Sequence, residues 1–85
     1  MTPKELLKLG FEEVKVTAKE SGGSAYTYYT FDPYLGDDTA SLISDEIDEG
    51  DDVDKDLTVE FFNTRDNQAP LSDKFIRMFT KEFRK

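Results

Sequence analysis

Residues 12–32 read EEVKVTAKESGGSAYTYYTFD, and this stretch decides the fold. Residues 14–19 alternate apolar and polar side chains, a pattern typical of a strand with one buried face. Residues 21–24 (SGGS) are expected to form a turn. Residues 25–32, rich in tyrosine and phenylalanine, are expected to form a second strand. Together the segments predict an antiparallel β-hairpin.

Upstream of the hairpin, the sequence predicts a short N-terminal helix with defined ends. Thr2 is the expected N-cap, Pro3 occupies the first helical position, and Glu5 completes a Thr-x-x-Glu capping box. Leucines at positions 6, 7 and 9 supply the apolar side. Gly10 is placed to end the helix in a left-handed conformation.

Downstream of the hairpin, two strands and a second helix are expected. Residues 40–44 and 57–62 are predicted strands, and residues 63–67 a turn. Ser72 is expected to cap a C-terminal helix. The predicted fold is a single two-layer α+β domain over residues 1–85. Its four-stranded, mainly antiparallel sheet carries an N-terminal and a C-terminal helix, in the order α-β-β-β-β-α.

Periodicity also assigns faces to the C-terminal helix. One narrow arc of the helical wheel holds Phe75, Ile76, Phe79 and Phe83, which predicts a buried seam. The opposite side carries a basic stripe of Lys74, Arg77, Lys81, Arg84 and Lys85. This stripe is either a solvated surface or a surface that attracts acidic side chains of the same or a neighbouring copy.

The sheet is expected to bury one face under the helices. The side chains assigned to that face are Val14, Val16, Leu57, Val59 and Phe61. Residues 25–32 carry aromatic side chains of both parities, so either Tyr26 and Tyr28 or Tyr29 and Phe31 must point away from the core. The outward pair is expected to be covered by loop 33–40 or to form a protein-contact patch, since tyrosine is favoured at interfaces.

The amino-acid composition excludes most kinds of catalytic mechanism. The chain has no cysteine and no histidine, which excludes disulfides and thiolate zinc sites and removes the commonest general base. No Gly-rich phosphate loop, GxSxG or HExxH motif is present. We therefore expect a protein that is not an enzyme and has no cofactor. Without an apolar run of membrane-spanning length or a signal peptide, the expected location is the cytoplasm.

Charge is distributed very unevenly along the chain. The net charge is −8, yet residues 1–31 are neutral, residues 32–60 carry −11 and residues 61–85 carry +3. Within residues 45–56, the acidic segment, eight carboxylates accompany a single lysine: Asp45, Glu46, Asp48, Glu49, Asp51, Asp52, Asp54 and Asp56. Such a density of charge predicts a solvated loop or a mobile tether.

Several interpretations of the acidic segment remain open. It could simply keep the protein soluble. It could instead present closely spaced negative charge, as duplex DNA does, and block a basic, nucleic-acid-binding site on another protein. In that case its eight acids, with Tyr26 and Tyr28, would be the partner-binding residues. Direct nucleic-acid or membrane binding is disfavoured by the net charge, and a monomer or small homo-oligomer is expected.

Two further alternatives compete with a blocking function. A small structural or assembly component, such as part of a virion or scaffold, would join the basic helix of one copy to the acidic segment of the next. A calcium site of the EF-hand type requires Gly50 at the sixth loop position, which puts Ile47, without a side-chain oxygen, at the third. The segment therefore fails that pattern, and only weak divalent counterion binding remains open.

The N-terminal third also carries a resemblance. Residues 6–11 (LLKLGF), the strand that follows and residues 26–29 (YTYY) resemble the opening of small uncharacterised acidic proteins of bacteriophages and mobile elements. Such proteins are similar to host-defence inhibitors, including anti-CRISPR and anti-restriction proteins, some of which are DNA mimics. The resemblance implies a bacterial host cell as the setting and transfers no functional residue.

Overall fold

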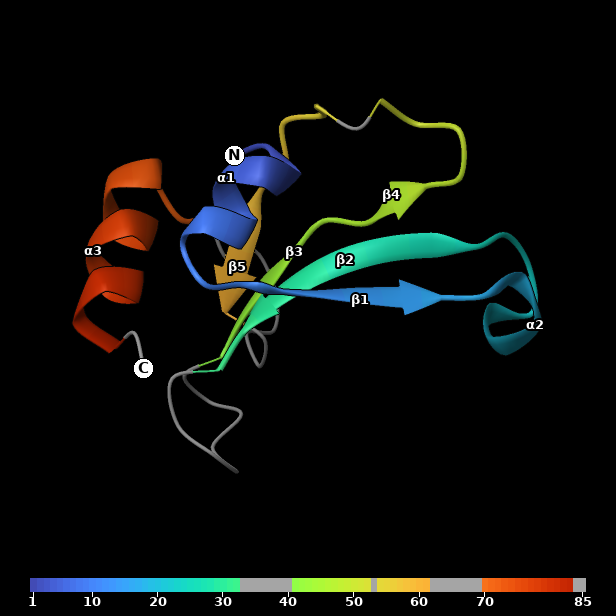
Figure 1. The fold of residues 1–85 in the computed structure, drawn as a ribbon, viewed down its shortest axis with the longest axis horizontal. Helices are drawn as coiled ribbons and strands as arrows, with labels where there is room; N and C mark the ends of the chain where they lie inside the picture. Colours follow the sequence, from blue (N-terminus) through green and yellow to red (C-terminus); the bar gives the residue numbers. More distant parts are fainter. Residues whose placement is uncertain (33–40, 53, 62–69, 84–85) are drawn as a thin grey trace.

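A five-stranded open sheet with helices packed on it forms the molecule (Figure 1). The computed structural model describes residues 1–32, 41–52, 54–61 and 70–83. The expected α+β class and the mainly antiparallel sheet are confirmed, and these residues hold one more strand and one more helix than predicted. In chain order the elements are α1 (Pro3–Lys8), β1 (Glu12–Val16), α2 (Ala18–Ser21), β2 (Tyr26–Phe31), β3 (Leu42–Ser44), β4 (Ile47–Asp48), β5 (Val59–Phe61) and α3 (Asp73–Phe83).

Helix α1 has the ends that its sequence predicts. The Thr2 side chain accepts a hydrogen bond from the Glu5 N–H, and the Glu5 carboxylate accepts one from the Thr2 N–H at 3.1 Å, which completes the capping box. Gly10 follows the helix with φ at 102°. The N–H groups of Gly10 and Phe11 donate to carbonyls of the last turn, each at 3.1 Å, so the helix ends in a Schellman motif.

Strands β1 and β2 form the predicted antiparallel hairpin, but their connection differs. The prediction that the strand continues through Ala18 is wrong, because β1 ends at Val16 and the short helix α2 follows. Thr17 caps this helix by accepting a hydrogen bond from the Glu20 N–H at 3.2 Å. Gly22 closes it with φ at 75°, so the connection holds more than the predicted four-residue turn.

The order of strands across the sheet is β1-β2-β3-β5, and every described pairing is antiparallel. Strand β4 also pairs with β2. It pairs with Tyr26 and Thr27 at the start of β2, whereas β3 pairs with Thr30 and Phe31 at its end. The third and fourth predicted strands correspond to β3 and β5, although β5 begins at Val59 rather than at Leu57. The predicted turn at 63–67 lies outside the described residues.

Helices α1 and α3 cover one face of the sheet. Helix α3 presents the predicted phenylalanine seam, and Ile76, 1% exposed, is buried in the core. Phe79 meets Phe31 of β2 and Phe61 of β5 edge-on, with ring centroids 6.1 and 6.0 Å apart. Ser72 caps α3 as predicted by accepting from the Phe75 N–H at 3.1 Å.

The prediction that Val14 and Val16 of β1 face the helices is wrong. Val14 lies opposite Tyr28 and Val16 opposite Tyr26, so these four side chains share one face of the sheet. The helices cover the other face, where Tyr29 and Phe31 are buried. The valines point away because the register between β1 and β2 places Glu13, not a valine, beside Tyr29. For β5 the prediction holds, since Val59 is buried and Phe61 packs against the core.

No helix among the described residues combines the length and apolarity that a membrane span requires.

Candidate functional site

The acidic segment is attached to the rest of the domain at both ends. At its start, the Asp45 N–H donates to the Thr58 carbonyl at 2.9 Å, and the Asp45 carboxylate accepts from the Thr58 N–H at 3.1 Å and from its hydroxyl at 2.5 Å. At its end, the Asp56 carboxylate accepts a hydrogen bond from the N-terminal amine of Met1 at 2.5 Å. The same amine donates to the Leu57 carbonyl at 2.8 Å.

The middle of the acidic segment contains strand β4 (Ile47–Asp48) and a turn, so the prediction of a loop or mobile tether is wrong there, whereas the prediction that the charged side chains are solvated is confirmed. Strand β4 pairs with β2 in the register Thr27↔Ile47 and Tyr26↔Asp48. Half-buried Ile47 packs against the core and supplies the apolar contact that the charged neighbours cannot make. The Glu49 N–H extends the pairing by donating to the Ala25 carbonyl at 3.2 Å.

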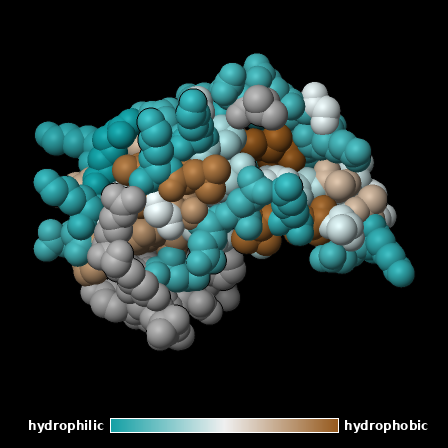
Figure 2. Space-filling model, viewed as in Figure 1, coloured by the Kyte–Doolittle hydropathy of each residue, from teal (hydrophilic) through white to brown (hydrophobic). Residues whose placement is uncertain are grey.

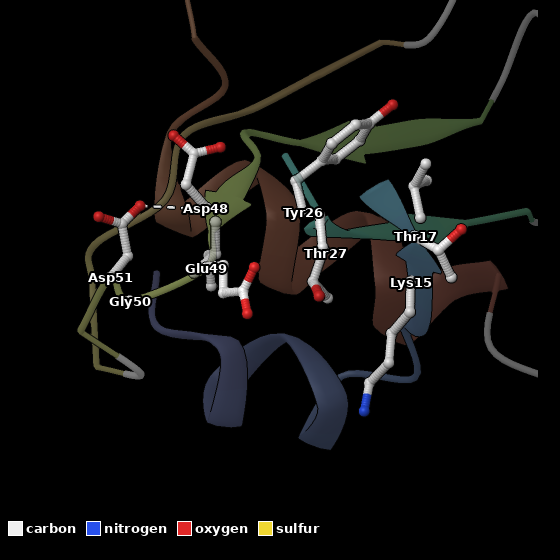
Figure 3. Close-up of a pocket in the computed structure, with 11 residues that line it drawn as sticks. Lys15, Thr17, Tyr26, Thr27, Asp48, Glu49, Gly50 and Asp51 are labelled. Atoms are coloured by element: carbon white, nitrogen blue, oxygen red, sulfur yellow. Dashed lines mark hydrogen bonds between the residues drawn. The ribbon is translucent and has the colours of Figure 1, made fainter. Parts of the chain in front are cut away.

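A tight turn follows β4 (Figure 3). The Asp48 N–H donates to the Asp51 carboxylate at 2.9 Å, and the Asp51 N–H donates back to the Asp48 carbonyl at 3.0 Å. Gly50 provides the positive φ of 94° within this turn. The hydrogen bond from the Asp48 backbone holds the pKa of Asp51 below its usual value, and the Lys55 ammonium, 3.4 Å away, acts in the same direction.

All eight carboxylates of the acidic segment are on exposed residues. In Figure 2, hydrophilic side chains line the upper edge of the molecule, where β4 and the chain after it run in Figure 1. Only two of the eight carboxylates form an ion pair within the described chain, Asp51 with Lys55 and Asp56 with the N-terminal amine. The Asp56 side chain is still 90% exposed. The negative charge of the segment is therefore largely uncompensated over the described residues.

The eight carboxylates divide into two sets. Four of them accept hydrogen bonds that hold the backbone or the N-terminus: Asp45, Asp51, Asp52 and Asp56. The other four make no side-chain hydrogen bond or ion pair within the described residues, and we call them the free acids: Glu46, Asp48, Glu49 and Asp54. The sequence does not distinguish these sets, because the distinction depends on which carboxylate meets a backbone N–H.

The described part of the basic stripe does not neutralise the acidic segment. Arg77 of α3 pairs with Glu5 of α1, with 2.9 Å between the guanidinium nitrogen and the carboxylate oxygen. Lys74 and Lys81 are exposed on the same helix. Arg84 and Lys85, the other members of the stripe, lie outside the described residues.

The two candidate tyrosines lie together on the sheet face that the helices leave uncovered. Tyr26 and Tyr28 are half-buried, and their rings stack with centroids 6.2 Å apart and an interplanar angle of 28°. Because Tyr26 is paired with Asp48 across β2 and β4, the structure brings this tyrosine pair next to the acidic segment. The expected cover, loop 33–40, lies outside the described residues.

A groove that the sequence did not indicate lies where the acidic segment meets the hairpin. Its volume is about 420 Å³, and its lining includes Lys15, Tyr26, Thr27, Ile47 and Glu49. Lys15 and Thr27 extend to one side of the strands and Tyr26 to the other (Figure 3). The groove exists because β4 turns back onto β2, and a two-residue strand inside an acidic run gives almost no periodic signal.

Buried Tyr29 has the most perturbed titration in the described chain. Its hydroxyl donates to the Glu13 carboxylate at 2.9 Å, while its backbone N–H donates to the Ser44 hydroxyl at 2.9 Å. Burial, reinforced by Glu13, raises the pKa of Tyr29 to about 12. The phenol is therefore held in its neutral form to a higher pH than usual, as the hydrogen-bond donor to Glu13.

Within the part of the chain that the structure describes, no group of three acidic side chains is placed to hold a metal ion. Comparison with known proteins adds no relative, because no family model, no curated protein and no solved structure matches the chain.

Proposed function

We propose that this protein is a non-enzymatic binding protein whose acidic segment occupies a basic, nucleic-acid-binding site on another protein. One observation carries the proposal: the segment is hydrogen-bonded to the sheet at Asp45 and through β4, and to the N-terminus at Asp56, while its carboxylates stay exposed. A segment that served only solubility would not need to be held at both ends and at its centre.

The clustering of negative charge supports the choice of a nucleic-acid-binding site. Duplex DNA carries one negative charge per ~1.7 Å of helix axis. Even at the full extension of about 3.3 Å per residue, eight acids within twelve positions give about one charge per 5 Å, a lower density of the same sign. A groove that binds the DNA backbone through lysine and arginine would therefore meet a run of closely placed negative charges.

The fixed backbone of the acidic segment also supports the proposal. Ordering a flexible residue on binding costs about 1–2 kcal/mol of backbone entropy, which would oppose association if the segment were a mobile tether. Here strand β4 and the turn at Gly50 fix the segment before any partner arrives. The binding free energy of the carboxylates is then not offset by folding of the segment.

The tyrosine pair would supply contact area beside the charge. Tyr26 and Tyr28 present half-buried rings next to Asp48, and tyrosine combines an apolar ring with a polar hydroxyl. Apolar contact at the centre with charge around it is the usual composition of a protein interface. The resemblance to small acidic phage proteins fits the same function, an inhibitor of host defence acting in the bacterial cytoplasm, as anti-CRISPR and anti-restriction proteins do.

The test exploits the division of the acids into two sets. A neutralised variant changes only the free acids: Glu46→Gln, Asp48→Asn, Glu49→Gln and Asp54→Asn. A matched control removes four acids elsewhere on the surface: Glu12→Gln, Glu60→Gln, Asp73→Asn and Glu82→Gln. Each variant has a net charge of −4, from −8 with four acids removed, so any difference between them reports position rather than total charge.

Wild type and both variants are immobilised and exposed to bacterial lysate, and bound proteins are eluted with duplex DNA. We expect the wild type and the control to retain DNA-eluted proteins whose DNA binding the soluble wild type then inhibits. The neutralised variant should lose at least tenfold in inhibition. Equal inhibition by all three proteins, or no DNA-eluted protein on the wild type, contradicts the proposal.

A further inference from the structure

Strand β1 is an edge strand whose outer side has no partner among the described residues. It lies at the end of the order β1-β2-β3-β5 and pairs only with β2 (Figure 1). Every second N–H and C=O of its five residues therefore points away from the sheet, in the arrangement that pairs with another strand. Its side chains are exposed or half-buried, so another strand could approach.

The sequence of β1 is self-complementary when it is paired with a second copy. Two antiparallel strands related by a two-fold axis place a residue opposite itself, with the others paired symmetrically around it. Centred on Val14, the pairing puts Glu13 opposite Lys15 of the second copy, and Lys15 opposite Glu13 of the second copy. Centring on Glu13 or on Lys15 instead puts like charges directly opposite, which is destabilising.

We propose that two copies of this chain associate by antiparallel pairing of their β1 strands, centred on Val14. Both Glu13–Lys15 contacts lie on the sheet face that carries Tyr29, and Val14 meets its own equivalent on the opposite face. The two sheets then become one continuous sheet through the middle of the dimer.

The side chains at this edge are already positioned for such a contact. The Glu13 carboxylate accepts from the Tyr29 hydroxyl at 2.9 Å through one oxygen and lies 3.4 Å from the Lys15 ammonium through the other. The Lys15 side chain is 75% exposed and can reach a second carboxylate. The dimer joins two such pairs into an alternating cluster of four charges.

The dimer also leaves the candidate binding surface accessible. Strand β4 pairs with the opposite edge of β2, so β1 and the acidic segment lie on different sides of that strand. With strands spaced about 4.8 Å apart, the two acidic segments lie about 24 Å from each other across five strand spacings. The tyrosine pairs face the same side of the continuous sheet, one pair from each copy.

Two charge reversals test the register. Glu13→Lys places the introduced lysine opposite Lys15 twice in its homodimer, and Lys15→Glu places two glutamates opposite each other twice. Association is measured by sedimentation equilibrium at physiological salt, with circular dichroism to verify the fold. Each single variant should associate about tenfold to thirtyfold more weakly than the wild type, because two cross-strand pairs change from attractive to repulsive.

Mixing the two single variants should restore association, since every Lys then faces a Glu in the heterodimer. The double variant E13K/K15E should also dimerise, because it keeps the complementarity with the signs exchanged. If Glu13→Lys fails to fold through loss of the Tyr29 hydrogen bond, Lys15→Glu, which keeps that hydrogen bond, still decides the register.

A wild type that remains monomeric at millimolar concentration overturns the proposal, as does a mixture that associates no better than its components. The neutralised variant of the acidic segment should dimerise as the wild type does. Its loss of dimerisation would instead place the contact at the acidic segment and overturn pairing through β1.

Discussion

Replacing Tyr29 by phenylalanine should change how stability depends on pH. In the folded protein the pKa of Tyr29 is raised from 10.0 to about 12, because burial and Glu13 favour the neutral phenol. A raised folded-state pKa contributes stability that is fully present below the unfolded-state pKa. That contribution is lost as the pH rises from about 10 to 12.

The expected size follows from this shift. One pKa unit corresponds to 1.36 kcal/mol, so the shift from 10.0 to about 12 sets a ceiling of about 2.7 kcal/mol. The Glu13 side chain is 35% exposed and solvent screens its contribution, so we expect about 1–2 kcal/mol. At pH 8, Tyr29→Phe should lower the free energy of unfolding by about 1 kcal/mol through loss of the hydroxyl hydrogen bond.

The assay compares urea unfolding of wild type and Tyr29→Phe at pH 8 and pH 11. The two proteins differ only at residue 29, so the difference between their pH dependences isolates Tyr29. The wild-type advantage of about 1 kcal/mol should vanish or reverse by pH 11. An independent check is the phenolate absorbance of the folded wild type, which should include a component that ionises near pH 12 and is absent from the variant, since the variant keeps only three of the four tyrosines.

An unchanged stability difference between pH 8 and pH 11 would refute this reasoning, because the phenol would then ionise as readily in the folded state as in the unfolded chain.

Three further predictions concern the scaffold and the acidic segment. Gly10→Ala should lower the free energy of unfolding by about 1–2 kcal/mol, measured by thermal melting, because Gly10 has φ at 102°. Ile76→Ala should cost about 2–5 kcal/mol in urea unfolding, because Ile76 is 1% exposed; a cost below 1 kcal/mol would contradict its place in the core. Asp51→Ala should speed hydrogen exchange at the Glu49 amide by loosening the turn after β4, whereas Asp54→Ala, its matched control, should not. Equal exchange in both would show that the Asp51 hydrogen bond does not hold the turn.

Features encoded by neighbouring residues could be predicted from the sequence. The capping box and Schellman end of α1 depend on side chains and N–H groups within a few positions of one another. The phenylalanine seam of α3 follows from helical periodicity alone. Helix α2 also had a local signal, since Thr17 and Glu20 repeat the Thr-x-x-Glu pattern of α1, but the alternation before it suggested a longer strand.

Features set by contacts between distant segments could not be predicted. The alternation in β1 shows that Val14 and Val16 share a face, but only the register with β2 determines which face the helices cover. The charge density of the acidic segment correctly predicted that its carboxylates are exposed to solvent. The fixed path of the segment depends on Ile47 packing against the core and on Asp45 meeting Thr58, thirteen positions away.

The separation of roles among the carboxylates makes the acidic segment a site for grafting. The side chains at positions 46, 48, 49 and 54 make no hydrogen bond or ion pair within the described residues, so we expect that their identity can be changed while the backbone of the domain is kept. Lysines at these four positions would convert the same rigid backbone from an acidic to a basic ligand. A family of recognition surfaces could thus be displayed on one small sheet, each differing only in four side chains.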